Sequence, residues 1–326
     1  MSTMANTAHA ANLESIRAAR YRIDPLIHRT PVLTSATLDA VSGRRLWFKC
    51  ELFQKTGSFK FRGATNAVRM LSDAAAARGV VTHSSGNHAQ ALALAARMRG
   101  IPAHVVMPSN SAEIKKAAVR GYGARIIECE PTLEARESTA ARVIAETGGA
   151  MIPPFNHPDV IAGQGTIALE FLDECPQLDA IVVPLGGGGL ISGIAIAAKA
   201  LKPSIRIIGA EPELAGDAAA SKRSGAIEPA MKPVTIADGL RTSLGPLTFP
   251  VVRDLVDEIV LVSEADIAAH MRFAWERMKI TIEPSAAVGV AVACSAWMRA
   301  RENADMRDVG VVLCGGNVDL SALPFG

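Results

Sequence analysis

Short β-branched runs alternate with alanine-rich segments from residue 80 onward, and this alternation limits the possible folds more than any other feature. In chain order the strand-like and helical runs are 80–82, 87–98, 104–107, 112–121, 124–127 and 134–146. A strand that returns after each helix pairs in parallel with the strand before it, and the helices cover the faces of the sheet. This part of the chain therefore predicts one open parallel sheet flanked by helices.

A second series of the same kind begins at 180–183, passes through a glycine loop into a helix ending near Lys199, and returns at 205–208. The last strand-like run is 311–314, and the proline-rich stretch 153–158 resembles a crossing between two compact units. We expect an α/β protein of two domains, each an open, mostly parallel sheet flanked by helices. The expected large domain comprises 1–75 and 157–326, and the small one 76–156. Ligands of such sheets bind beyond the carboxyl ends of the strands, so the cleft between the domains is the expected site.

The charge balance of the chain points to a small-molecule partner. With 34 Lys and Arg against 32 Asp and Glu, the formal net charge is +2 and no long single-sign block occurs. Proteins that bind nucleic acid or membrane surfaces usually carry such blocks, so we expect neither partner. The 5 cysteines are scattered without a CxxC pair, which argues against a disulfide framework and a zinc site. We expect a cytoplasmic protein without membrane-spanning segments.

Lys60 ends the motif Lys55-Thr56-Gly57-Ser58-Phe59-Lys60. Small residues before it let the backbone approach a planar ligand. Phe59 and Phe61 on either side favour a desolvated ammonium with a lowered pKa, which suits imine formation. A lone lysine at a helix start is more often a solvated surface residue, so the motif needs support from other parts of the chain.

A tetraglycine, Gly186, Gly187, Gly188 and Gly189, follows an apolar strand and opens a helix. Backbone N–H groups without side chains beside a positive helix end form a phosphate cradle. A dinucleotide fold is the competing interpretation, with Glu211 at the end of the next strand as the ribose-binding acid. Ser192 stands where that fingerprint requires its third glycine, which disfavours it.

Ser84, Ser85, Gly86, Asn87 and His88 form a third loop, between the strand at 80–82 and the next helix. Hydroxyls, an amide and unpaired N–H groups at a helix start suit the carboxylate of a substrate. An ordinary helix cap has the same composition. Together, the lysine, the phosphate loop and the carboxylate loop are the parts that a pyridoxal-phosphate (PLP) site needs.

The chain resembles the serine racemase and serine/threonine dehydratase family, the fold-type-II PLP enzymes, whose fold is tryptophan-synthase-β-like. The similarity extends from about Thr30 to Leu320. Besides the three loops, the motifs that carry it are Thr30-Pro31-Val32-Leu33, Ala162-Gly163-Gln164-Gly165-Thr166, Ile282-Glu283-Pro284 and Gly315-Gly316-Asn317-Val318-Asp319.

The resemblance implies that Lys60 carries the cofactor as a Schiff base and removes the Cα proton. Phe59 packs on the pyridine ring, Asn87 bonds its 3′-oxygen, and the tetraglycine holds its phosphate. The ring nitrogen faces Cys314, where many relatives have Ser. A neutral thiol is a weak partner, so the ring nitrogen is expected to stay unprotonated.

Ser85 is the position that separates activities by resemblance. Threonine dehydratases usually have Ala there, whereas racemases and hydroxyaspartate dehydratases have Ser, which returns a proton to the opposite face of Cα. Serine racemase with serine dehydratase activity is therefore the first expectation. Catabolic threonine dehydratase, 3-hydroxyaspartate dehydratase and a non-catalytic amino-acid-binding relative stay open. The hydroxyaspartate alternative needs a further cation, with Arg136, Arg241 and His83 as candidates.

Further site residues are implied by resemblance alone. Glu211, the carbonyl of Ala215 and Asp217 match the family's divalent-cation loop, and all-oxygen ligands select Mg²⁺, Ca²⁺ or Mn²⁺. Arg136 and Ser243 match positions that line the active site, with Ser84, Gly86 and His88 as further substrate contacts. A homodimer is the expected assembly.

Overall fold

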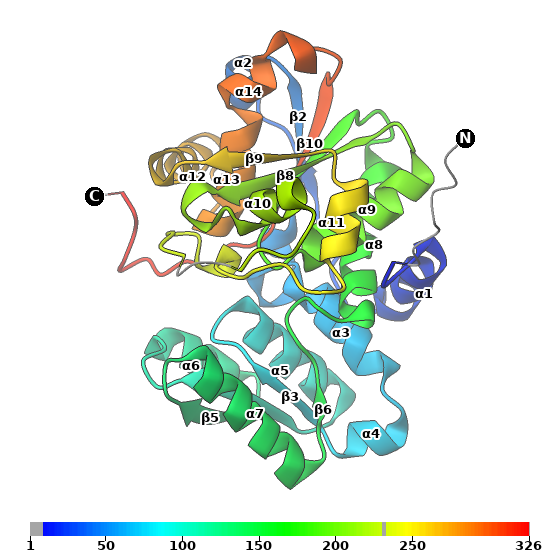
Figure 1. The fold of residues 1–326 in the computed structure, drawn as a ribbon, viewed down its shortest axis with the longest axis vertical. Helices are drawn as coiled ribbons and strands as arrows, with labels where there is room; N and C mark the ends of the chain where they lie inside the picture. Colours follow the sequence, from blue (N-terminus) through cyan, green and yellow to red (C-terminus); the bar gives the residue numbers. More distant parts are fainter. Residues whose placement is uncertain (1–8, 230–232, 326) are drawn as a thin grey trace.

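The protein was analysed as a computed structural model, which describes residues 9–229 and 233–325. Two sheets organise it, one of four strands and one of six. In Figure 1 the smaller sheet with its helices forms the lower body and the larger sheet the upper. Each sheet is built from the βα units that the sequence predicts, so the expected fold class is confirmed.

The four-stranded sheet is entirely parallel, in the order β5-β4-β3-β6. Its strands are β3 (Val80–His83), β4 (Ala103–Pro108), β5 (Arg125–Cys129) and β6 (Ala150–Met151), and its accompanying helices are α4 (Asp73–Ala77), α5 (Asn87–Arg99), α6 (Glu113–Gly121) and α7 (Leu133–Thr147). Buried aliphatic residues such as Val80 and Val105 fill the space between strands and helices.

The six-stranded sheet has the order β1-β2-β10-β7-β8-β9, parallel except for the edge pair β1–β2. Its strands are β1 (Val32–Leu33), β2 (Arg45–Cys50), β7 (Ala180–Pro184), β8 (Arg206–Pro212), β9 (Glu258–Val262) and β10 (Asp308–Leu313). The helices of this body are α1 (Leu13–Ile23), α2 (Ala36–Ser42), α3 (Lys60–Met70), α8 (Pro158–Glu174), α9 (Gly189–Leu201), α10 (Asp217–Ser224), α11 (Phe249–Leu255), α12 (Glu264–Met278), α13 (Pro284–Ala293) and α14 (Ala296–Arg299). Short 3₁₀ turns η1 (Glu51–Phe53), η2 (Lys55–Gly57), η3 (Glu213–Ala215), η4 (Asp238–Leu240) and η5 (Arg301–Asn303) join them.

The sequence pattern missed four strands: β1, β2, β6 and β9. Strands β1 and β6 have only two residues each, too few to show a period. Strand β2 contains Lys49, which looks solvent-facing in sequence but is fully buried. The final strand ends at Leu313, so Cys314 follows it.

Helix α3 joins the two bodies, because it packs on α8 in the larger one and on α5 in the smaller one. Its first turn carries Arg62, which is fully buried and bonds two carboxylates at once. Nε and Nη2 donate to Glu51 at 2.7 and 2.8 Å, while Nη1 and Nη2 donate to Glu170 at 2.6 and 2.9 Å. Lys49 adds a second cation, 2.9 Å from Glu170.

We call Lys49, Glu51, Arg62 and Glu170 the buried quartet. Burial by itself raises the pKa of Glu170, but hydrogen bonds and the charges of Arg62 and Lys49 outweigh it and hold that pKa below its usual value. The quartet ties the start of α3, two residues beyond Lys60, to β2 and α8. The helix that presents Lys60 is therefore attached to the larger sheet by a charge-balanced cluster.

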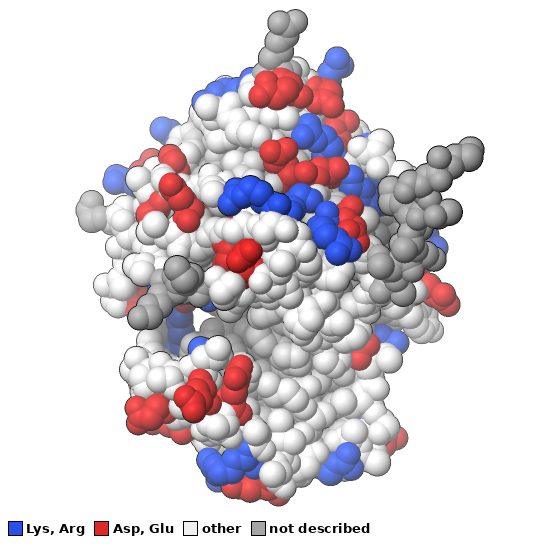
Figure 2. All heavy atoms as spheres, in the orientation of Figure 1, with Lys and Arg blue, Asp and Glu red and all other residues white. Residues whose placement is uncertain are grey.

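On the face shown in Figure 2, Lys and Arg side chains are interspersed with Asp and Glu side chains, as the near-balanced composition predicts. Over the described ranges, no helix is both long and apolar enough to span a bilayer.

Candidate active site

Lys60 is the first residue of α3 and follows a strained turn. Thr56 and Gly57 have φ values of 63° and 72°, in the left-handed region, and a Cβ at Gly57 would lie 2.5 Å from Asn317 Oδ1. Glycine at 57 is thus required both by its φ and by its space. The turn delivers the Lys60 amine to the Pro154 carbonyl at 2.8 Å and 5.0 Å from the centre of the Phe59 ring.

Burial lowers the pKa of Lys60 to about 8, although Cys314 and Glu283 act in the opposite direction. A lysine with such a pKa holds an appreciable fraction of neutral amine near neutral pH, which is what a nucleophile toward an aldehyde needs. The sequence-based expectation of a desolvated lysine therefore agrees with the geometry.

The tetraglycine connects β7 to α9 in a closely packed turn. A Cβ at Gly187 would lie 2.6 Å from the Phe155 ring, and one at Gly186 would lie 2.8 Å from the Leu240 backbone. Gly188, the N-cap of α9, has a φ of 86° and provides no side-chain cap. The leading N–H groups of α9 therefore have no capping side chain, which fits a phosphate at this helix start.

The serine loop lies between β3 and α5, with Ser84, Ser85 and Gly86 half-buried. Its first N–H donates to Val106 at 3.1 Å, and the Ser84 hydroxyl accepts from the Gly86 N–H at 3.4 Å. Gly86, the N-cap of α5, offers no side-chain cap, and a Cβ there would meet nothing within 4 Å. Open space beside an uncapped helix start suits a small carboxylate.

Asn87 connects the serine loop to two residues that the sequence analysis did not single out. Its Nδ2 donates to both Glu283 carboxylate oxygens, at 2.9 and 3.1 Å, and its Oδ1 accepts from Asn317 Nδ2 at 2.9 Å. Asn317 also donates to the Thr56 carbonyl at 2.7 Å. One N–H of the Asn87 amide is left for a ligand.

Glu283 is buried, and burial raises its pKa to about 7. Both Glu283 and Asn317 stand inside motifs that carry the family resemblance, and this position in the sequence was the available signal. Their role depends on contacts with Asn87 and Thr56, more than 190 residues away in the chain for each pair. Sequence spacing does not indicate such contacts.

Cys314 follows β10 and is 2% exposed. Its carbonyl accepts the Phe59 N–H at 3.0 Å, which places this cysteine beside the Lys60 turn. Burial, reinforced by the charge of Glu283, raises the pKa of the thiol well above its ordinary value. The thiol is neutral, as the sequence analysis assumes for the partner of a pyridine nitrogen.

His88 has a different environment from the one expected of a substrate contact. It is 2% exposed, and its Nε2 lies 2.9 Å from the Ile152 carbonyl. His83 is half-buried, and after burial the charge of Arg136 is the largest cause that lowers its pKa. Arg136 and His83 thus lie near each other at the serine loop, whereas the Arg241 guanidinium donates to the Thr235 carbonyl.

The expected cation site lies around the start of α10. Glu211 accepts N–H bonds from Ala218 and Ala219 at 2.7 and 2.9 Å. Burial raises the pKa of Glu211 to about 8 and that of Asp217 to about 6, and Asp217 Oδ2 is buried without a hydrogen-bond partner. An orphaned carboxylate oxygen beside a second carboxylate fits a hard divalent cation. Among described residues, no cluster of three or more His, Cys, Asp or Glu side chains suited to a metal occurs.

Ser243 is half-buried in the segment that leads from η4 to α11. The next residue, Leu244, donates its N–H to the Asp217 carboxylate, so this segment contacts the expected cation site.

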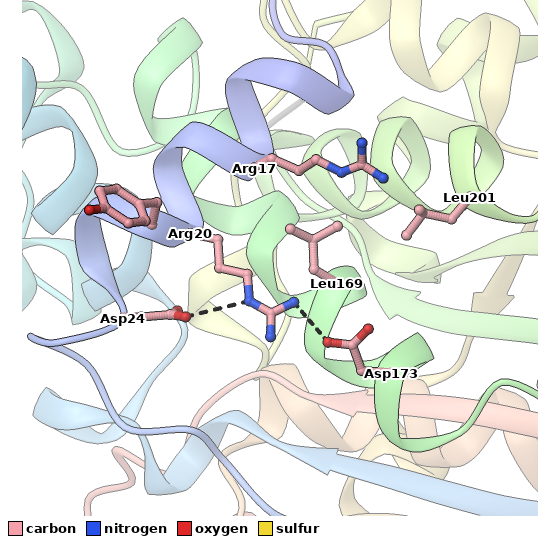
Figure 3. A pocket seen from close by; sticks show the side chains of 7 residues that line it. Arg17, Arg20, Asp24, Leu169, Asp173 and Leu201 are labelled. Atoms are coloured by element: carbon pink, nitrogen blue, oxygen red, sulfur yellow. Dashed lines mark hydrogen bonds and ion pairs between the residues drawn. The ribbon is translucent and has the colours of Figure 1, made fainter.

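A surface pocket of about 290 Å³ lies elsewhere, between α1, α8 and the end of α9. In Figure 3 Arg20 of α1 reaches between Asp24 and Asp173, and these ion pairs measure 3.4 and 2.7 Å. None of the residues predicted for the site lines this pocket. The predicted site residues gather instead around Lys60 and the loops after β3 and β7.

Comparison with known proteins agrees with this arrangement. The family described as "Pyridoxal-phosphate dependent enzyme" matches residues 23–315. A serine racemase from Arabidopsis thaliana is 54% identical over 316 residues, covering 97% of this chain and 96% of the relative. The structure of maize serine racemase superposes with a TM-score of 0.95 at 50% identity, covering 96% of this chain and 95% of that one. The crystal structure of a threonine deaminase from T.th. gives 0.89 at 42% identity, covering 95% and 100%. The chain therefore belongs to the fold-type-II family of pyridoxal-phosphate-dependent enzymes.

Proposed function

We propose that this enzyme is a serine racemase that also converts serine to pyruvate and ammonia. The observation that carries the proposal is Ser85: a half-buried hydroxyl in the loop after β3 that, among the described residues, makes no hydrogen bond. Relatives named serine racemase at about half identity support the same activity. Similarity to a threonine deaminase supports the elimination branch.

The cofactor would be held by Lys60, by the N–H groups of the tetraglycine, by the Phe59 ring and by the remaining Asn87 N–H. When bound, PLP supplies an electron sink for the negative charge that develops at Cα. Cys314 offers no charge to the ring nitrogen, because its thiol is neutral.

The protein residues handle binding and protons. The substrate carboxylate binds at the uncapped start of α5, which leaves Cα between Lys60 and Ser85. The neutral Lys60 amine takes the Cα proton on one face, and the Pro154 carbonyl holds the resulting ammonium. Ser85 donates a proton to the opposite face, which inverts the centre. Loss of the β-hydroxyl before reprotonation leads to pyruvate and ammonia instead.

The decisive experiment uses the purified protein with added PLP and the variant Lys60→Ala. We expect a visible-violet absorbance band in wild type that is absent from the variant. A wild-type protein that stays colourless after PLP addition would instead support a non-catalytic amino-acid-binding relative. L-serine, L-threonine and the isomers of 3-hydroxyaspartate are then compared as substrates, with 2-oxo acid and D-amino acid followed in parallel.

A second candidate is a dehydratase for 3-hydroxyaspartate, which forms oxaloacetate and ammonia. The proximity of Arg136 to His83 beside the serine loop favours it, because a second substrate carboxylate needs a cation there. Faster 2-oxo acid formation from a 3-hydroxyaspartate isomer than from serine would select this activity. A catabolic threonine dehydratase would instead favour L-threonine.

We further propose that Glu211, Asp217 and the Ala215 carbonyl bind Mg²⁺, Ca²⁺ or Mn²⁺ in a structural or activating role. The orphaned Asp217 oxygen supports this assignment. Residues 76–156 would form the small domain and the remainder the large PLP-binding domain, in line with the two sheets. We also propose a cytoplasmic homodimer. All five cysteines are free, which suits a reducing compartment, and sedimentation would test the assembly.

A further inference from the structure

Residues 152–156, which lead from β6 to α8, contact each of the predicted functional loops, and we call them the crossing segment. The Pro154 carbonyl accepts from the Lys60 amine at 2.8 Å. The next side chain, Phe155, packs against Gly187 and Gly189 of the phosphate loop. Asn156 Oδ1 accepts the Leu247 N–H at 2.9 Å. The position of this segment therefore affects where the Lys60 amine is held.

His88 anchors the start of the crossing segment. A carbonyl oxygen only accepts hydrogen bonds, so the 2.9 Å contact with Ile152 requires the proton on Nε2. Nδ1 is then unprotonated, and it is buried without a partner. Burial, followed by the charge of Lys60, lowers the pKa of His88 to about 3, so the ring is neutral at physiological pH.

The link from His88 to Lys60 is short and stiff. Ile152, whose carbonyl His88 holds, is separated from Pro154 only by Pro153, and proline rings fix φ at both intervening positions. A displacement of the Ile152 carbonyl therefore passes to the Pro154 carbonyl with little room for the backbone to absorb it. The ring of His88 is turned toward this backbone and is closed off from solvent.

We propose that His88 is a positioning residue that acts through the Ile152 and Pro154 carbonyls on the Lys60 amine, and that it does not contact the substrate. This inference rests on the proposed role of Lys60 as the PLP lysine. It replaces the sequence-based expectation that His88 binds substrate together with Ser84 and Ser85.

The test compares two variants of similar side-chain length. His88→Gln keeps an N–H donor at the end of the side chain, whereas His88→Met has none. The first readout is the pH dependence of the rate at which PLP combines with the apoprotein, which reports the Lys60 pKa without any turnover. The second is the separation of kcat from KM for L-serine, and the third is Tm.

We expect His88→Met to lower the Lys60 pKa by about one unit, because an ammonium held less well by its acceptor carbonyl gives up its proton more easily. Its kcat should fall about tenfold or more from a misplaced amine, with KM nearly unchanged. His88→Gln should restore both values toward wild type. If His88→Met fails to fold, Pro154→Gly, which keeps the carbonyl but frees its backbone, should lower the Lys60 pKa in the same direction.

Two results would overturn the inference. One is a raised KM in His88→Met with the Lys60 pKa unchanged, which would make His88 a substrate contact. The other is equal loss in the Gln and Met variants, which would make the donor irrelevant. In either case wild type would still form its visible band with PLP, whereas failure of the proposed function would remove that band from wild type itself.

Discussion

Replacing Arg62 by Met should destabilise the protein strongly, although the residue lies outside the catalytic loops. The change removes the cation that Glu51 and Glu170 share, while both carboxylates remain buried. Lys49 is left to balance two negative charges. Breaking a buried ion pair from one side costs about 3–5 kcal/mol, because the remaining charge loses its partner but not its burial.

The magnitude can be followed by urea unfolding and by thermal unfolding with circular dichroism. For a single transition of 326 residues, the unfolding entropy is roughly 0.7 kcal/mol per kelvin, so about 4 kcal/mol lowers Tm by roughly 6 °C. Arg62→Lys serves as the matched control, since it keeps the charge but loses the bidentate contacts, and we expect an intermediate loss.

The pH dependence provides an independent check. In wild type the lowered pKa of Glu170 contributes stability above the ordinary carboxyl pKa, and that contribution is lost as the pH falls through the lowered value. In Arg62→Met the same carboxylate is buried without Arg62, so its protonation at low pH relieves the variant. The stability difference should thus be largest near neutrality and should narrow below about pH 4.5. A variant within about 1 kcal/mol of wild type at pH 7, or a difference that grows on acidification, would refute this reasoning.

Three further predictions concern the site. Ser85→Ala should abolish D-serine formation while pyruvate formation from L-serine persists, measured in one reaction mixture; equal loss of both would contradict a separate proton donor on the second face. Gly187→Ala should weaken PLP binding at least tenfold, roughly the effect of a lost charge-assisted hydrogen bond, because its Cβ would press on the Phe155 ring at 2.6 Å; titration of apoprotein followed by the visible band measures this, and unchanged affinity would count against the phosphate cradle. Because burial raises the pKa of Glu211 to about 8 and that of Asp217 to about 6, the apoprotein should become more stable as the pH falls from 8 to 6, and the Tm increase caused by added Mg²⁺ or Ca²⁺ should grow from pH 6 to 8. Glu211→Gln should reduce that cation effect, and a cation response equal to that of wild type would argue against this loop.

The order of strands, helices and glycine-rich loops was predictable from sequence because each depends on neighbouring residues. Alternation of apolar runs determined the βα units, and the place of the tetraglycine after an apolar strand indicated a phosphate loop. The motif around Lys60 likewise indicated a desolvated lysine. These signals are local, since a strand, a turn or a helix start is set mainly by the few residues that form it.

Other features depended on contacts between residues far apart in the chain. Lys49 and Arg62 look like surface charges in sequence, yet they lie fully buried against Glu51 and Glu170. Glu283 reaches Asn87 across 196 positions, and His88 points to Ile152 and away from solvent. Whether a polar side chain meets substrate, cofactor or a buried carbonyl is decided by which segments pack together. Sequence alone therefore determined which chemical groups this protein has, and only the tertiary structure decided which of them face one another.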